Sequence, residues 1–408
     1  MKSSVRAWVG SMTLAAGLVA ASAAWAQDKA PIKIGLIDIY SGGLAFIAEM
    51  IKGGFQVALD DANAAGGMDG RMFELETADM GFKVEKAVTE ARRMILEQDI
   101  KLLSVGIHSG AAVAVSAIAK EQGALMIGGF AVTKRLTGES GHDLVGRANL
   151  STVELGAIMA EYLRDKPEIK RVSTIAPDYE YGQHFVADFI VGLKKIRPDI
   201  EVVRQEWPKL GAADFASHVT ALQAQPIDMV VAGVFGGDLI NFVKAASDFG
   251  LFEDAALFVH GSDIGKMASM KDILPKNTHT TLWYPFYSID TPESNSFKAA
   301  VEKLVGTYPS GSAPVGYIAG RMIVEAVKKA GTDDPAAVAK ALKGLTFPTP
   351  VGPAEVRGCD HMAMYNFYVG KVAWGDELPG GIGVPDAKAV NFKTVARPCE
   401  EIAKLRGN

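Results

Sequence analysis

The residue of this sequence with the most direct binding chemistry is Ser109. It stands where an apolar run of strand length gives way to an Ala/Val-rich helical pattern. A serine hydroxyl at such a position, together with the free amides of the helix start, can bind a carboxylate. The alternative is that Ser109 only caps the helix.

A second set of donors follows the next apolar run. Thr133, or the backbone amides of Ala131 and Val132, could supply these donors, and an ordinary surface loop is the alternative. Asp263 follows the apolar run 256–260 and could pair with a ligand ammonium group. A helix N-cap or a turn is the alternative for Asp263. The pattern predicts a small carboxylate ligand, with Asp263 as the residue that would favour an amine.

Aromatic side chains fall in loops of the same kind, directly after apolar runs. Rings on both sides of a cleft favour a ligand with an apolar or flat body. For each ring the alternative is a place in the core. The residues of this set are Phe46, His108, Phe130, Tyr179, Tyr181 and Phe235.

The sequence carries no local signature of catalysis. It has no GxSxG, HExxH or Walker A pattern and no GxGxxG after its first apolar run. His108 is adjacent to Ser109, but neighbouring positions do not by themselves form a nucleophile and base, and no acid partner is identified. No other histidine stands at metal-ligand spacing to His108. We therefore expect a binding protein without enzymatic activity, metal or cofactor.

Alternating strand-like and helical segments must position these loops. Such alternation predicts parallel sheets that are covered by helices on both faces. Ligands of such sheets bind outside the carboxyl ends of the strands, where the candidate residues lie. The strand-like runs are 32–39, 100–107, 124–130, 171–176, 228–235 and 256–260, and helical patterns include 48–63, 110–122, 181–196 and 238–249.

The chain divides into two lobes in this interpretation. About five strand–helix units precede a break at 146–148, and a second set reaches roughly residue 280. The remaining segment has no complete series of its own and is expected to pack back onto both lobes. We predict an α/β fold of two doubly wound parallel-sheet lobes with three crossings. Lobe 1 is residues 27–148 plus 284–362, and lobe 2 is residues 149–283 plus 363–408.

Residues 1–26 are expected to be a signal peptide. Lys2 and Arg6 precede an apolar run that ends at Ala24-Trp25-Ala26, which fits a signal-peptidase site. A membrane anchor is the alternative, although the run is short for a span. No cysteine stands beside the cleavage site to carry a lipid. The mature chain is therefore predicted to be exported as a soluble protein.

The net charge bears on which partners the protein can bind, and the cysteine content bears on how its C-terminal region is held. Removing the two basic residues of the leader takes the formal charge from −5 to −7, so nucleic acid is not an expected partner. The only two cysteines, Cys359 and Cys399, are expected to form a disulfide in an oxidising compartment. Metal or redox chemistry is the alternative for this pair, but there is no CxxC and no clustered histidine.

A family resemblance covers almost all of the mature chain and adds to this interpretation. It rests on Ile32-Lys33-Ile34-Gly35 with Ser41-Gly42, on the segment 61–70, on Ser109-Gly110, on Asp178-Tyr179-Glu180-Tyr181-Gly182, and on Gly352-Pro353 with Asp360-His361. In their order and spacing these motifs resemble the periplasmic branched-chain amino-acid-binding proteins, the leucine/isoleucine/valine type of ABC-importer receptor.

The resemblance implies a type I periplasmic binding fold, whose lobes close on the ligand about three hinge strands. It implies that Ser109 and residues 131–133 hold the ligand carboxylate, that Asp263 takes the ammonium group and that Tyr181 contacts the ligand. The implied partners are a small-molecule ligand and an ABC permease of the inner membrane, and the chain is expected to be a periplasmic monomer.

Three departures from the family pattern bear on the ligand. His108 and Phe130 stand where small residues are common, and Val132 stands where a hydroxyl is often found. These residues narrow the pocket and add aromatic walls, which makes an aromatic acid of the benzoate or cinnamate type the alternative to an amino acid. A ligand sensor for a signalling receptor is the alternative to transport, because both roles need only a closing cleft.

Overall fold

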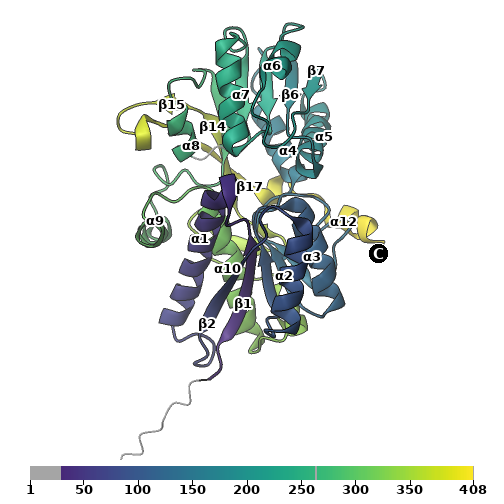
Figure 1. Cartoon of the computed structure of the whole chain (residues 1–408), viewed down its shortest axis with the longest axis vertical. Coiled ribbons are helices and arrows are strands. Elements are labelled where there is room, and N and C mark those ends of the chain that lie inside the picture. The colour runs from purple at the N-terminus through teal and green to yellow at the C-terminus, as the bar shows by residue number, and fades with distance from the viewer. Residues whose placement is uncertain (1–28, 262–263, 408) are drawn as a thin grey trace, which may run out of the picture.

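The computed structural model describes residues 29–261 and 264–407. The expected signal peptide, residues 1–26, and Asp263 therefore lie outside the described residues. The chain forms two α/β lobes, one above the other in Figure 1, which confirms the predicted fold class. No helix of the described residues is both long and apolar enough to span a membrane.

The first lobe is built on a five-stranded sheet in the order β2-β1-β3-β4-β5, and every neighbouring pair is parallel. Strands β3 and β4 are buried along their whole length, as apolar runs covered on both faces must be. The elements are β1 Ile32–Asp38, α1 Ala45–Ala64, β2 Phe73–Asp79, α2 Val84–Leu96, β3 Leu102–Val105, α3 Ser109–Glu121, β4 Leu125–Gly128 and β5 Val145–Arg147.

Three later helices return to this lobe: α9 Pro292–Val305, α10 Ser312–Ala330 and α11 Pro335–Leu342. Helices α1 and α10 pack closely because each presents glycine to the other. A Cβ at Gly54 would lie 1.8 Å from the carbonyl oxygen of Ala313, and one at Gly316 would lie 2.0 Å from that of Ile51. Larger residues at these two positions would separate the helices.

The second lobe has a seven-stranded sheet in the order β17-β14-β10-β9-β8-β6-β7. Strands β6 to β10 pair in parallel, whereas β14 and β17 join antiparallel, so the tail completes this sheet. The elements are α4 Thr152–Tyr162, β6 Arg171–Ile175, α5 Glu180–Ile196, β7 Glu201–Glu206, α6 Ala216–Leu222, β8 Met229–Ala232, α7 Gly236–Asp248, β9 Ala256–Val259, α8 Ile264–Ser269, β10 Thr278–Leu282, β14 Asn366–Lys371 and β17 Lys388–Asn391.

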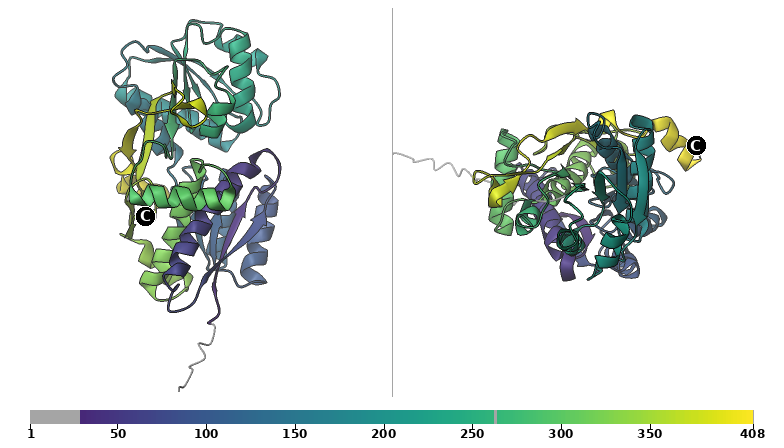
Figure 2. Two further views of the ribbon diagram at one scale, coloured as in Figure 1. Left: turned by 90° about the vertical axis from the view of Figure 1, so that its left-hand side faces the viewer. Right: turned by 90° about the horizontal axis from the view of Figure 1, so that it is seen from above.

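The chain passes between the sheets after β5, after β10 and before β14, and these crossings lie side by side. The amide of Arg147 donates to the carbonyl of His361 at 3.1 Å, which joins the first and third crossings. The indole Nε1 of Trp283 donates to Oδ1 of Asn149 at 2.8 Å, which joins the second to the first. In Figure 2 the yellow tail runs along one side of both lobes. The chain after α11 also contains the short strands β11 Thr346–Phe347, β12 Ala354–Val356, β13 Ala363–Met364, β15 Ala373–Trp374 and β16 Ile382–Gly383.

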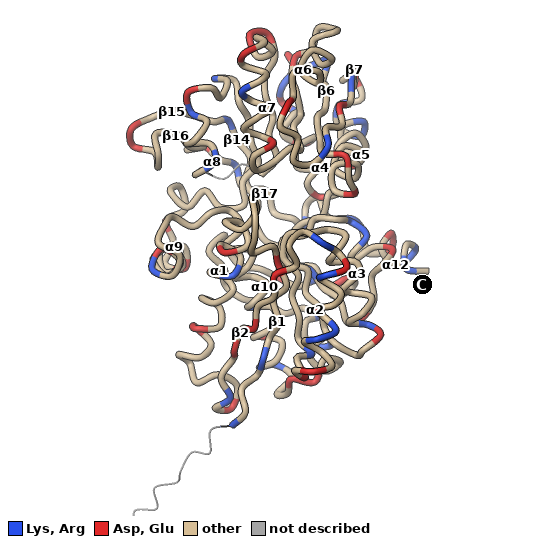
Figure 3. The backbone as a smooth tube through the Cα atoms, in the orientation of Figure 1, with Lys and Arg blue, Asp and Glu red and all other residues tan. Residues whose placement is uncertain are grey.

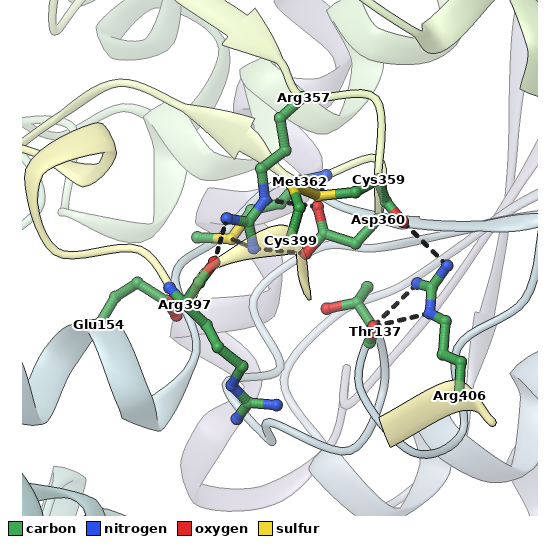
Figure 4. The surroundings of a disulfide bond; sticks show 9 residues. All are labelled: Thr137, Glu154, Arg357, Cys359, Asp360, Met362, Arg397, Cys399 and Arg406. Atoms are coloured by element: carbon green, nitrogen blue, oxygen red, sulfur yellow. Dashed lines mark hydrogen bonds and ion pairs between the residues drawn. A yellow bond between two sulfur atoms is a disulfide. The ribbon is translucent and has the colours of Figure 1, made fainter. Parts of the chain in front are cut away.

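The predicted disulfide between Cys359 and Cys399 is present, and it ties down the C-terminal helix α12, Cys399–Arg406 (Figure 4). Arg406 of this helix donates to the carbonyl oxygens of Thr137 and Cys359. Helix α12 therefore bonds to first-lobe residues, although the tail from residue 363 was expected in the second lobe.

Charges of both signs are interspersed over both lobes in Figure 3, and within residues 29–261 and 264–407 no long segment carries a single sign. Among the described residues no group of three or more His, Cys, Asp or Glu side chains is placed to hold a metal ion.

Candidate functional site

A cavity of about 390 Å³ lies between the two lobes. It is open at the carboxyl ends of the parallel strands, and its walls are mainly apolar and aromatic. The first lobe contributes Phe46, Ile47, Ile107, Ser109, Phe130, Val132 and Ser312, the second contributes Tyr179, Tyr181, Phe235, Leu239, His260, Lys266 and Ser269, and Trp283 comes from a crossing. Six of the ten expected site residues thus line one cavity: Phe46, Ser109, Phe130, Val132, Tyr181 and Phe235.

Ser109 is the first residue of α3, but it is not the cap of that helix. The N-cap is His108, whose Nδ1 accepts a hydrogen bond from the amide of Ala111 at 3.1 Å. The Ser109 hydroxyl has no hydrogen-bond partner among the described residues, although the residue is only 2% exposed. Because His108 caps the helix, the Ser109 hydroxyl is left for a ligand in the cavity.

His108 does not line the cavity, in contrast to the prediction. Its ring packs against Phe82, with centroids 4.5 Å apart, and burial lowers its pKa. The helix cap holds the imidazole in this position, so it contributes to the loop before Ser109 and not to the cavity wall.

The loop 131–133 meets the cavity only through Val132. Ala131 and Thr133 are fully buried, and their carbonyl oxygens accept hydrogen bonds from the guanidinium of Arg147. The Thr133 hydroxyl donates to the carboxylate of Glu180 at 2.6 Å. In this structure the Thr133 hydroxyl is therefore used between the lobes, which leaves the backbone amides as the donors that this loop can offer to a ligand.

Ionic contacts beside the cavity join the two lobes. Lys134 forms an ion pair with Asp188 at 2.7 Å, and Arg135 forms one with Glu180 at 3.3 Å. The side chain of Asp188 is only 9% exposed and also accepts a hydrogen bond from the hydroxyl of Thr152 at 2.6 Å. In this structure the two lobes are thus in contact through these ion pairs.

The aromatic wall of the second lobe is centred on Tyr181. Its hydroxyl donates to the carbonyl of Gly233 at 3.1 Å, which fixes the ring, and the ring meets Phe235 edge to face at a centroid distance of 5.8 Å. Burial raises the pKa of the Tyr181 phenol well above its usual value, so the hydroxyl stays neutral. Tyr181 presents an apolar ring to the cavity.

Trp283 and His260 also line the cavity, and the sequence did not single them out as site residues. The Trp283 ring lies 4.7 Å from that of Phe130 and 5.0 Å from that of His260, so it connects the walls of the two lobes. A local signal existed for both: His260 ends a predicted strand, and Trp283 begins the segment expected to cross between the lobes. The predicted ammonium partner, Asp263, lies outside the described residues.

Asp38 supports the loop that carries Ser109 from beneath. It is fully buried, and its Oδ1 accepts hydrogen bonds from the amides of Ile39 at 2.9 Å and Ile107 at 3.0 Å. Oδ2 has no partner among the described residues. Burial raises the pKa of this carboxyl to about 7, against the two backbone amides that lower it.

Replacing Asp38 by Asn is expected to reduce the loss of stability with rising pH. A carboxyl whose folded pKa is raised contributes stability at low pH that is lost as the pH rises through that pKa. From a folded pKa of about 7, the loss assigned to Asp38 between pH 5.5 and 8 is about 2 kcal/mol. An Asn can keep the acceptor for both amides without the charge. Urea unfolding of both proteins at the two pH values measures the difference, and parallel pH profiles would contradict it.

Comparison with known proteins gives this architecture a family. The model of the periplasmic binding protein family matches residues 31–377. A Leu/Ile/Val-binding protein homolog 7 from Brucella abortus (strain 2308) is 26% identical over 353 residues, which cover 81% of this chain and 86% of that protein.

Solved structures agree in fold. The closed leucine-, isoleucine-, valine-, threonine- and alanine-binding protein from Brucella ovis superposes with a TM-score of 0.80 at 22% identity, covering 91% of this chain and 98% of that one. An ABC-transporter solute-binding protein from Rhodopseudomonas palustris BisB5, in complex with 3,4-dihydroxybenzoic acid, also has a TM-score of 0.80, at 23% identity and with 91% and 99% coverage.

The family match spans most of the chain, including the first sheet, all three crossings and every strand of the second sheet except β17. Membership supports a location outside the cytoplasm. The chain therefore belongs to the periplasmic binding protein family, a family of non-enzymatic solute-binding proteins, and the Leu/Ile/Val-binding relative confirms the resemblance that the sequence motifs indicated.

Proposed function

We propose that the protein captures a small carboxylate with a hydrophobic body, a branched-chain or other hydrophobic amino acid, and delivers it to an ABC permease in the inner membrane. The observation that carries the proposal is the Ser109 hydroxyl, which lies in an apolar cavity without a partner among the described residues. The start of α3 adds free amides and a favourable dipole for a carboxylate. In this proposal residues 1–26 are a cleaved signal peptide, and the chain acts in the periplasm.

The proposed site combines one polar anchor with apolar walls. Ser109, with backbone amides of the loop 131–133, holds the carboxylate, because no acceptor within the described residues takes the amides of Ala131, Val132 or Thr133. Phe46, Phe130, Val132, Tyr181 and Phe235 surround the ligand body. Asp263 is the proposed partner of the ligand ammonium group. The Leu/Ile/Val-binding relatives support this assignment.

An aromatic acid is the second candidate, and the ring cluster favours it. Phe130, Trp283 and His260 follow one another across the cavity with centroid distances of 4.7 and 5.0 Å, and such a wall suits a flat ligand. The Rhodopseudomonas palustris structure with 3,4-dihydroxybenzoic acid shows that a chain of this fold accommodates such an acid.

Ser109→Ala is expected to weaken every carboxylate ligand by roughly 1–3 kcal/mol, the scale of hydrogen bonds to a charged group. Titration calorimetry with leucine, phenylalanine and benzoate measures the loss and shows which ligand class binds more tightly. Ser247→Ala, on the exposed side of α7, is the matched control and should bind as the unaltered protein does. Undiminished affinity of Ser109→Ala would remove Ser109 from the site, and binding of none of the acids would refute the proposed function.

We also propose that residues 27–148 plus 284–362 and residues 149–283 plus 363–408, apart from α12, move as two bodies about the three crossings. The ion pairs of Lys134 and Arg135 with α5, and the aromatic walls from both lobes, support a closed state that a ligand stabilises. Small-angle scattering with and without saturating ligand should show a smaller radius of gyration in the complex. An equal radius in both states would count against closure.

A further inference from the structure

His260 is a polar side chain in the apolar wall of the cavity. It follows β9 directly, is only 8% exposed and lines the cavity. Its ring stacks on Phe185 at 5.8 Å with an interplanar angle of 26°, and it lies 5.0 Å from the Trp283 ring. These ring contacts restrict the orientation of the imidazole.

The hydrogen bonds around Thr281 determine which nitrogen of His260 carries the proton. Thr281 is fully buried, and its Oγ1 accepts from the amide of Gly261 at 2.9 Å. The same hydroxyl lies 3.1 Å from Nδ1 of His260. Among the described residues this nitrogen is the only acceptor for the proton of the Thr281 hydroxyl. Because a buried hydroxyl donates where it can, Nδ1 accepts this hydrogen bond and the neutral ring carries its proton on Nε2.

Nε2 is therefore a donor at the cavity wall. The described residues offer Nε2 no hydrogen-bond partner, and this atom is not fully enclosed by them, so a molecule in the cavity can reach it. Burial lowers the pKa of His260 to about 3, so the ring is neutral throughout the physiological range and does not act as a cation toward the ligand.

We propose that His260 is a specificity-determining residue whose Nε2–H donates to an uncharged oxygen, a hydroxyl or carbonyl, on the part of the ligand remote from its carboxylate. The inference rests on the proposed function, in which Ser109 holds the carboxylate from the opposite lobe. An ammonium group has no acceptor to offer to this N–H. A buried donor without a partner is costly, so a ligand that lacks the oxygen is disfavoured.

Matched ligands test this proposal directly. Calorimetry compares benzoate with 3- and 4-hydroxybenzoate, and phenylalanine with tyrosine. The unaltered protein is expected to bind at least one hydroxylated acid about tenfold more tightly than its parent, the factor of a good neutral hydrogen bond. The preference should be equal at pH 5.5 and pH 8, because His260 does not titrate between them.

Variants assign the preference to His260. His260→Phe keeps the ring volume and removes the donor, so it should abolish the preference, while the parent acid should bind at least as tightly as it does to the unaltered protein because no N–H is left unpaired. His260→Gln can place an N–H near the same point and should retain part of the preference. His218→Phe is the matched control, since His218 contacts Glu206 on the second lobe outside the cavity, and it should retain the full preference.

Three results would overturn the inference. The first is that the unaltered protein binds the parent acids and their hydroxylated forms with equal affinity. His260→Phe, folded as judged by circular dichroism, could weaken parent and hydroxylated acids equally, which would place the carboxylate itself at His260. If the unaltered protein binds none of these acids, the proposed function fails first and the inference fails with it.

Discussion

Arg147→Met is expected to destabilise the protein by on the order of 4 kcal/mol or more. Arg147 is fully buried, and its guanidinium donates to the carbonyl oxygens of Asn149 at 2.8 Å, Thr133 at 2.9 Å, Ala131 at 2.8 Å and Leu150 at 2.9 Å. Methionine fills similar space but donates nothing, so several buried carbonyls lose their partner at about 1–3 kcal/mol each.

The charge of Arg147 adds to this cost. Burial lowers its pKa to about 10, while Glu154 and Asp360 act in the opposite direction, so the guanidinium remains charged at neutral pH. Arg147 also joins the loop 131–133 to the first crossing, so a folded variant should bind ligand more weakly. Loss of one side chain thus affects both the hinge and the cavity wall.

Urea unfolding at pH 7 measures the effect. The unfolding free energy of Arg147→Lys is expected to lie between those of the unaltered protein and Arg147→Met, because one ammonium group cannot reach the same four oxygens as a planar guanidinium. Arg92→Met, on the exposed face of α2, is the control and should stay within about 0.5 kcal/mol of the unaltered protein. An Arg147→Met protein as stable as that control would show that the four hydrogen bonds contribute little.

Removing the disulfide, as Cys359→Ser with Cys399→Ser, is expected to cost roughly 3–4 kcal/mol of unfolding free energy. The bond joins residues 40 positions apart, and closing a loop of this length restricts the unfolded chain by about that amount in the chain-entropy model. Arg357, which bonds to Asp360 and to the carbonyl of Arg397, still holds the same region together in the folded state (Figure 4).

Chemical unfolding with and without a reductant provides the measurement. The reductant should lower the stability of the unaltered protein to that of the double variant and should not change the double variant itself. Mass spectrometry under non-reducing conditions checks the bond directly, and two free thiols in freshly exported protein would be incompatible with it.

The fold follows from local patterns to a large extent. Apolar runs such as 100–107 and 171–176 contain the observed strands β3 and β6, and the helical pattern 181–196 differs from α5 by one residue at its start. Burial on both faces requires continuous apolar runs, so parallel strands can be recognised from the sequence. The tail from residue 363 was assigned to the second lobe, but the antiparallel pairing of β14 and β17 was not predicted, because β14 pairs with β10, which is distant in sequence.

The candidate site divides in the same way. Ser109 could be located from the sequence, because a loop between a parallel strand and a helix lies at the edge of the sheet where ligands bind. The direction in which each side chain points could not be predicted from the sequence, because it depends on partners that are distant in the chain. Thr133 turns to Glu180, 47 residues away, and His260 is oriented by Thr281 on the neighbouring strand.

By itself, then, the amino-acid sequence determined the two-lobed α/β fold, the loops that surround the cavity and the pairing of the only two cysteines. Each of these depends on local periodicity or on composition. Only the tertiary structure decided that His108 caps α3, that Arg147 lies beneath the cavity wall, and that Trp283 and His260 line it. These arrangements depend on hydrogen bonds and ring contacts between segments that meet only when both lobes have folded.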